Sequence, residues 1–199
     1  EMIHGSYVDY VATSGLDSVT QYELWKAIWS SLNDGNFYEL AHTLDRHATF
    51  SEAYLPMTFV GNHDVTRLAS RLDDPRHLGH ALAVLIAVAG SPSVYYGDEQ
   101  AFHGTKYECW GGDDEIRPAL PPDPAGLAPF GWPAFRMHQR LIGLRRRHPW
   151  LSRCRTTVVH LANRALALRC TPRDGGPQVV TVLLNLDDQP CRFPVDLLD

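Results

Sequence analysis

Two short apolar stretches of this chain each end in glycine followed by polar residues. The first, MTFV (57–60), is followed by GNHD (61–64), and the second, SVYY (93–96), is followed by GDE (97–99). The two stretches begin 36 residues apart and bracket a helical pattern over 65–89. That spacing is typical of a β-α-β unit, so the sequence predicts two consecutive parallel strands whose ends carry polar groups.

Helical periodicity is also found on both sides of this unit. Residues 18–32 and 36–46 predict two helices before the first strand, and residues 133–148 predict one after the second. The helical pattern between the strands should break near 73–75, because proline disfavours helix in the residue before it. The segment 97–132 is rich in glycine and proline and is too long to be a simple connection.

The pattern changes after Pro149 to short β-rich segments separated by turn residues. These are TTVVHLA (156–162), RALALRC (164–170) and QVVTVLLNL (178–186). They predict an antiparallel hairpin or meander. We therefore expect a first domain over 1–150 and a small β domain over 151–199.

Composition and charge exclude several classes of partner. The 199 residues are 44% hydrophobic and 21% charged with a net charge of −5, which is ordinary for a globular protein and offers no basic surface for nucleic acid. No apolar run approaches the roughly 18 residues needed to span a membrane. The basic run 145–148 closes a helical pattern, where positive charge is favourable. The sequence therefore predicts neither a nucleic-acid nor a membrane partner.

Cysteine spacing and the first residue limit two further inferences. No CxxC motif is present, so neither a zinc site nor a redox motif is predicted. Cys154 and Cys170 flank the possible hairpin and can pair, although free thiols are the favoured interpretation. The chain begins at Glu1 and shows no signal-peptide pattern, so we expect further sequence upstream and cannot read the localisation.

The polar strand ends are the main candidates for chemistry. Asn62, His63 and Asp64 follow the first strand, and Asp98 and Glu99 follow the second. Carboxylates that face each other across a cleft are what glycosyl transfer requires, one as an acid and others ionised. Three alternatives stay open: Asp64 as a helix N-cap, His63 as a core histidine, and the acidic pair as the start of a solvated loop.

Other side chains also allow two interpretations. Tyr107 and Trp110 can be platforms for sugar rings, although aromatic residues that pack within a loop are more common. His77 and His80 can share a helix face and, with residues 63–64, form a metal site, but no further ligand has suitable spacing. The sequence therefore makes metal-dependent hydrolysis a minor alternative and predicts no metal ligand.

Four segments together resemble the α-amylase family of glycoside hydrolases. FVGNHDVTR (59–67) is similar to the family's fourth conserved region, usually FVDNHD, and SPSVYYGDEQ (91–100) is similar to its strand-eight segment, typically GxPxxYYGDE. EMIHGSY (1–7) resembles the third region, and GGDDEIRPAL (111–120) resembles the loop after strand eight. The order and spacing of all four agree with the family.

The resemblance implies a fold and two catalytic groups. The fold would be α/β, the second half of a (β/α)8 TIM barrel followed by part of a small antiparallel β-sandwich domain. Glu1 would match the general acid/base that protonates the glycosidic oxygen and later activates water. Asp64 would match the third carboxylate, which binds sugar hydroxyls and helps to stabilise the transition state.

The resemblance also implies a substrate and its contacts. His63 would hydrogen-bond the sugar, and Asn62, His4 and Arg67 are further candidates for substrate binding. The substrate would be an α-glucan or α-glucoside, with α-1,4 linkages between glucose units. No cofactor is evident in the sequence, although family members often bind calcium, so calcium is a candidate for the intact protein.

The chain departs from the family in two ways. Gly61 stands where the family usually has aspartate. The nucleophile of retaining chemistry would lie upstream of Glu1, so we expect these 199 residues alone to be inactive and poorly folded, and the intact protein to be a glycosidase or transglycosidase. The alternative is a non-catalytic remnant that binds carbohydrate or a protein partner.

Overall fold

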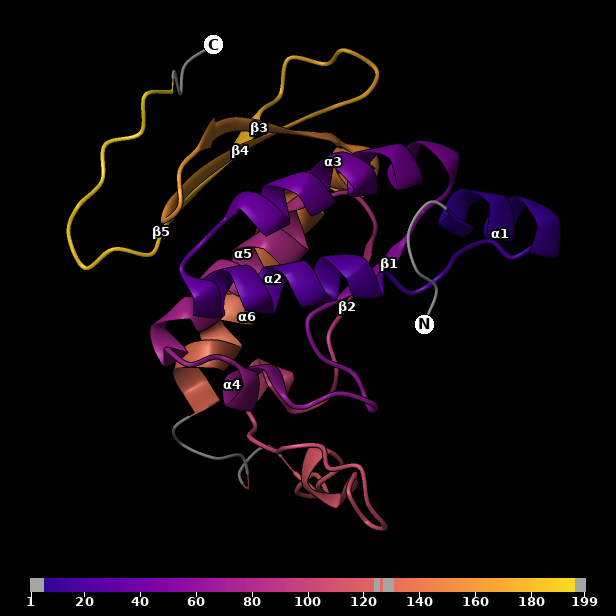
Figure 1. The fold of residues 1–199 in the computed structure, drawn as a ribbon, viewed down its shortest axis with the longest axis vertical. Coiled ribbons are helices and arrows are strands. Elements are labelled where there is room, and N and C mark those ends of the chain that lie inside the picture. Colours follow the sequence, from indigo (N-terminus) through magenta and orange to yellow (C-terminus); the bar gives the residue numbers. More distant parts are fainter. Residues whose placement is uncertain (1–5, 124–125, 127–130, 196–199) are drawn as a thin grey trace.

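The computed structural model describes residues 6–123, 126 and 131–195 and shows helices around a short parallel sheet, with a second, antiparallel sheet after them (Figure 1). The helices are α1 (Ser6–Ser14), α2 (Tyr22–Asp34), α3 (Tyr38–Ala53), α4 (Leu68–Arg71), α5 (Leu78–Ala87) and α6 (Trp132–Arg147). The strands are β1 (Met57–Phe59), β2 (Ser91–Ser93), β3 (Arg155–Leu161), β4 (Ala165–Thr171) and β5 (Val180–Asn185). From α2 onward the predicted order of helices and strands is confirmed, whereas α1 was not predicted.

β1 and β2 are parallel, with Met57 opposite Ser91. β2 begins and ends earlier than the predicted 93–96. The reason is that the backbone just before β2 passes close to the residue that precedes β1. Gly90 has φ +121°, and a Cβ there would lie 2.7 Å from the Pro56 carbonyl oxygen. The backbone therefore joins β1 at Ser91, and the tyrosines after Ser93 lie beyond the paired segment.

A third extended segment lies beside β1 and was not predicted. Thr20 forms a parallel bridge with Met57, supported by hydrogen bonds from the Gln21 N–H to the Met57 carbonyl (2.9 Å) and from the Met57 N–H to the Val19 carbonyl (3.1 Å). Three parallel segments therefore end at the same edge. α2 starts directly after this bridge, which is why the observed helix begins at Tyr22.

The predicted break between the strands is confirmed. α4 ends at Arg71, and a 3-10 turn over Pro75–His77 precedes α5. The Asp74 carboxylate accepts a hydrogen bond from the Arg76 N–H (2.8 Å) and so caps this turn.

The antiparallel sheet has the order β3-β4-β5 and packs against the helices. Leu166 and Leu168 of β4 belong to the same buried cluster as Leu24 of α2 and Leu85 of α5. In Figure 1 this sheet lies next to α3, with which β3 is in contact. The boundary near residue 151 stays a prediction, but the sheet and the helices share one apolar core.

Arg145, from the basic run at the end of α6, has a specific role in this core. Its guanidinium donates hydrogen bonds to the carbonyl oxygens of Ile86 (2.5 Å), Val88 (3.0 Å) and Gly90 (2.5 Å). The side chain therefore satisfies the carbonyl groups between α5 and β2. Its charge does more than complement the end of its own helix.

The four cysteines are free, as the sequence favoured. The Thr156 hydroxyl lies between two of them, 3.6 Å from the Cys154 sulfur and 3.7 Å from the Cys170 sulfur. Among the described residues, no helix is long and apolar enough to cross a membrane.

Candidate active site

The turn after β1 presents Asp64 to solvent. The Asn62 side-chain oxygen accepts a hydrogen bond from the Asp64 N–H (2.8 Å), and the Asn62 amide group donates to the Tyr22 hydroxyl (3.0 Å). Asn62 thus fixes the turn from both sides and ties it to α2. α4 begins only at Leu68, and its cap residue Arg67 makes no side-chain capping bond. The N-cap alternative for Asp64 is therefore wrong.

His63 and Arg117 contact the Asp64 carboxylate from two directions. His63 Nε2 lies 3.3 Å from Asp64 Oδ2, and Arg117 Nη2 lies 3.3 Å from Asp64 Oδ1. The His63 side chain is 65% exposed, so the core-histidine alternative is wrong as well. Arg117 also donates to the His63 carbonyl oxygen (3.0 Å) and pairs with Asp113 at 2.6 Å. These contacts leave the carboxylate accessible but restrict its orientation.

Arg117 was not among the predicted site residues. It is 53 residues from Asp64 in the sequence. The one available signal was its place in GGDDEIRPAL, the segment that resembles the family's loop after strand eight. Periodicity cannot reveal such a contact, because this loop has none.

Arg67 is placed differently from the expectation that it contacts substrate. Its side chain is fully buried and pairs with Asp98, with 2.9 Å between Arg67 Nη1 and Asp98 Oδ1. It also donates to the Tyr96 carbonyl oxygen (2.6 Å) and stacks on the Tyr95 ring, 4.2 Å from its centroid. The residue therefore supports the site from below by joining the segments that follow β1 and β2.

Asp98 is buried, so it does not open a solvated loop as one alternative proposed. Burial raises the pKa of Asp98 to about 6, although the hydrogen bond and charge of Arg67 lower it. Its position also leaves no room for a side chain at position 61. A Cβ on Gly61 would lie 2.2 Å from Asp98 Oδ2, so the Asp98 carboxylate occupies the place where a side chain at position 61 would begin.

The other predicted residues cannot be placed together with this turn. Glu1 and His4 lie outside the described residues. His80 Nε2 lies 3.0 Å from the Asn185 carbonyl oxygen, and His77 Nε2 lies 4.0 Å from an Asp74 carboxylate oxygen. Throughout the described ranges, no three His, Cys, Asp or Glu side chains are arranged to hold a metal ion.

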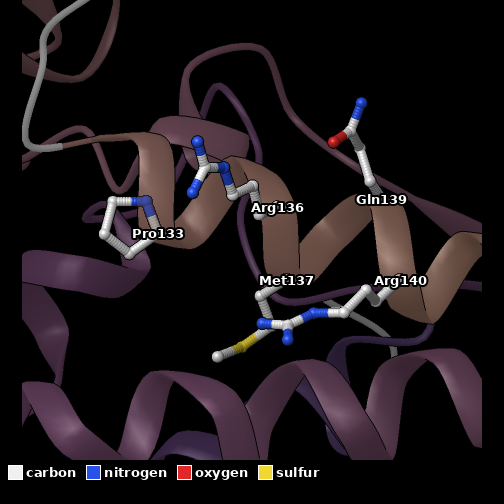
Figure 2. A pocket seen from close by; sticks show the side chains of 5 residues that line it. All are labelled: Pro133, Arg136, Met137, Gln139 and Arg140. Atoms are coloured by element: carbon white, nitrogen blue, oxygen red, sulfur yellow. The ribbon is translucent and has the colours of Figure 1, made fainter.

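A hollow of about 630 Å³ lies along α6, and none of the candidate residues lines it (Figure 2). It is lined by Pro133, Arg136, Met137, Gln139 and Arg140. All five side chains come from one helix and none is a carboxylate, so this hollow lacks the groups that glycosyl transfer needs.

Parallel strands linked through helices, with polar groups at their C-terminal ends, define the class of fold: an α/β fold of the barrel type, in which the strand tips are the usual place for a site. Comparison with known proteins identifies the family. Residues 1–153 match the model of the α-amylase catalytic domain. The chain belongs to the α-amylase family, and its fold is a partial (β/α)8 barrel followed by a small antiparallel sheet.

Several characterised relatives are similar in sequence. A cyclomaltodextrin glucanotransferase of Geobacillus stearothermophilus is 31% identical over 121 residues, which is 60% of this chain and 16% of the relative. A 4-alpha-glucanotransferase of Thermotoga neapolitana is 32% identical over 104 residues, or 51% of this chain and 21% of the relative. The chain thus matches only a minor part of the length of these proteins.

Solved structures agree with the fold. The α-amylase from H. orenii superposes with a TM-score of 0.72 at 18% identity, covering 91% of this chain and 40% of that structure. CldA, a cyclomaltodextrin glucanotransferase with a three-domain ABC distribution, gives a TM-score of 0.72 at 26% identity, covering 92% of this chain and 35% of that structure.

Proposed function

We propose that the protein containing this chain is a retaining glycosidase or transglycosidase acting on α-1,4-glucosidic linkages of glucose oligosaccharides or polysaccharides. The observation that carries this proposal is Asp64, an accessible carboxylate at a strand tip that is oriented by His63 and Arg117. The family relatives named above are glucanotransferases, and one solved neighbour, AmyP, was crystallised with maltose, which supports an α-glucan substrate.

The chemistry assigns different tasks to these residues. Asp64 and His63 hydrogen-bond the hydroxyl groups of one glucosyl ring, and the negative charge of Asp64 stabilises positive charge that develops on that ring in the transition state. Glu1 donates a proton to the departing glycosidic oxygen and then removes one from the incoming water or sugar hydroxyl. The nucleophilic carboxylate, which retaining chemistry needs about 5 Å from the acid/base, comes from sequence upstream of Glu1.

In this proposal the exposed residues contact the substrate, and residues beneath them hold the turn in place. Asn62 holds the turn through its two hydrogen bonds, and the Arg67–Asp98 pair fixes the backbone beneath it. A catalytic carboxylate has to be held within a fraction of an ångström of its productive position, so rigid support contributes directly to rate.

The proposal is tested with the full-length natural polypeptide and maltoheptaose. Products are separated by chromatography, and the anomeric configuration of the new reducing end is read by NMR. Asp64→Asn should lower kcat by about 10²–10³-fold, the typical cost of losing one group that stabilises transition-state charge. The matched control is Asp17→Asn, an exposed carboxylate just before the segment that pairs with β1, at the opposite edge of the sheet.

Retention of the α configuration together with loss of activity only in the Asp64 variant supports the proposal. Equal activity of the Asp64 and Asp17 variants would refute the role of Asp64. Binding of maltoheptaose without turnover by the full-length polypeptide would favour the alternative, a non-catalytic carbohydrate-binding member of the family.

A further inference from the structure

The loop after β2, residues 104–117, is firmly held against the candidate site. The Arg67 N–H donates to the Gly104 carbonyl oxygen (3.0 Å), which attaches the start of the loop to the turn after β1. A Cβ on Gly104 would lie 2.2 Å from the Glu115 carbonyl oxygen, so the two ends of the loop are in direct backbone contact. Ile116 is fully buried and anchors the returning end.

The tip of this loop is a tight turn that exposes an aromatic ring. The Tyr107 N–H donates to the Gly112 carbonyl (3.0 Å), and the Gly112 N–H donates to the Cys109 carbonyl (3.0 Å). Trp110 lies within the turn that these two hydrogen bonds close, and the relative exposure of its side chain is 102%. The expectation that Trp110 packs within the loop is therefore wrong. A fully exposed tryptophan on a constrained turn offers its whole ring surface to a ligand.

Trp110 also borders a hollow that shares Arg117 with the candidate site. This hollow has a volume of about 570 Å³, within the range of small-molecule sites, and its wall includes Lys106, Asp113 and Arg117. Arg117 pairs with Asp64 and with Asp113. Arg117 therefore connects the Asp64 carboxylate to the wall of the hollow that Trp110 borders.

The chemistry of this hollow fits a sugar chain. A glucosyl ring offers an apolar C–H face that stacks on an aromatic ring, and a rim of hydroxyl groups that bond to carboxylates and cations. The hollow supplies one exposed indole and charged groups of both signs. We propose that Trp110 is a stacking platform for a glucosyl unit beyond the one held by Asp64, and that it makes the enzyme prefer oligosaccharides to disaccharides. This inference rests on the proposed function.

The test compares chain lengths in the full-length natural polypeptide. Trp110→Ala removes the platform, Trp110→Phe retains an aromatic face, and Trp132→Ala is the control, since Trp132 is 41% exposed on α6. Steady-state kinetics are measured with maltose and with maltoheptaose, and maltoheptaose binding is measured by titration calorimetry. Trp110→Ala should raise KM for maltoheptaose about 10-fold, as expected for an aromatic binding residue, and leave maltose unchanged. Trp110→Phe should recover most of the affinity.

Each outcome decides the inference. Equal effects of Trp110→Ala on both substrates, or none on either, would overturn it. If the wild type turns over neither substrate, the proposed function fails, and calorimetry still decides the platform. Maltoheptaose binding that is lost only in Trp110→Ala then supports the platform, and the same affinity in all variants, or no binding by the wild type, refutes it.

Discussion

The contact between Gly61 and Asp98 leads to a prediction about stability that the structure makes quantitative. In Gly61→Ala, the new Cβ would lie 2.2 Å from Asp98 Oδ2, whereas ordinary contact begins at 3.4 Å. The carboxylate therefore has to move by about 1.2 Å, the difference between these distances. The other oxygen of this carboxylate, Oδ1, is paired with the buried guanidinium of Arg67 at 2.9 Å, and we expect the movement to break that pair. Breaking a buried ion pair costs about 3–5 kcal/mol, and relaxation places the expected loss near the lower value, about 3 kcal/mol.

A double-mutant cycle separates this mechanism from general overpacking. If alanine at position 61 acts by displacing the carboxylate, it should cost little once Asp98→Ala has removed that group. The free energy of unfolding is measured by urea denaturation of the full-length protein for both single variants and the double variant. Gly143→Ala, within α6, is the control and should be neutral or stabilising, because alanine has a higher helix propensity than glycine. Additive losses in the double variant would refute the reasoning.

The same geometry predicts a rescue. The family usually carries aspartate at the position of Gly61, and the Asp98 carboxylate lies where that side chain would begin. Moving the carboxylate, with Gly61→Asp and Asp98→Gly together, should give Arg67 a partner again and recover part of the lost stability. A double variant no more stable than Asp98→Gly alone would show that the two positions are not equivalent for Arg67.

Four further predictions concern three individual side chains and the activity of the isolated chain. Burial lowers the pKa of His47 to about 4 from an ordinary value of 6.5, so between these pH values the unfolded chain binds a proton that the folded chain does not. The free energy of unfolding should therefore decrease as the pH falls from 6.5 towards 4. Urea denaturation at pH 7 and pH 5 should show a smaller decrease for His47→Gln than for the wild type. Arg145→Met leaves three carbonyl groups without their donor and should cost about 2–3 kcal/mol in the same assay, whereas Arg146→Met, on the exposed side of α6, should cost almost nothing. Arg117→Met frees the Asp64 carboxylate and should lower kcat/KM for maltoheptaose about 10–100-fold without changing the midpoint of unfolding, since Arg117 is exposed. The isolated 199-residue chain should release no product from maltoheptaose in an assay that detects the full-length protein, and turnover by the isolated chain would contradict the assignment of the nucleophile upstream.

The sequence predicted those features of the fold that leave a periodic signal. The apolar run at β1 and the proline at position 75 placed a strand end and a helix break correctly. The predicted helix over 18–32 was wrong at its start, because residues 19–21 are extended; a single bridge, Thr20 to Met57, leaves no alternating pattern. Contacts across loops also leave no signal in the sequence: Arg67 and Asp98 are 31 positions apart, and the helical pattern between them does not predict the pair.

A departure from a family motif is best interpreted together with the residue that lies next to it in space. Taken alone, Gly61 is the loss of a carboxylate next to the candidate catalytic turn, and it weakens the case for catalysis. In the structure, the carboxylate of Asp98, which follows the neighbouring parallel strand, lies 2.2 Å from where a Cβ at position 61 would be. Because parallel strands end at one edge, a side chain from either strand can fill the same position beneath the turn. The buried charge of Arg67 is thus compensated, and the turn that presents His63 and Asp64 keeps its support. In this chain, glycine at position 61 leaves room for the Asp98 carboxylate, and the support that Arg67 gives to the candidate turn depends on Asp98.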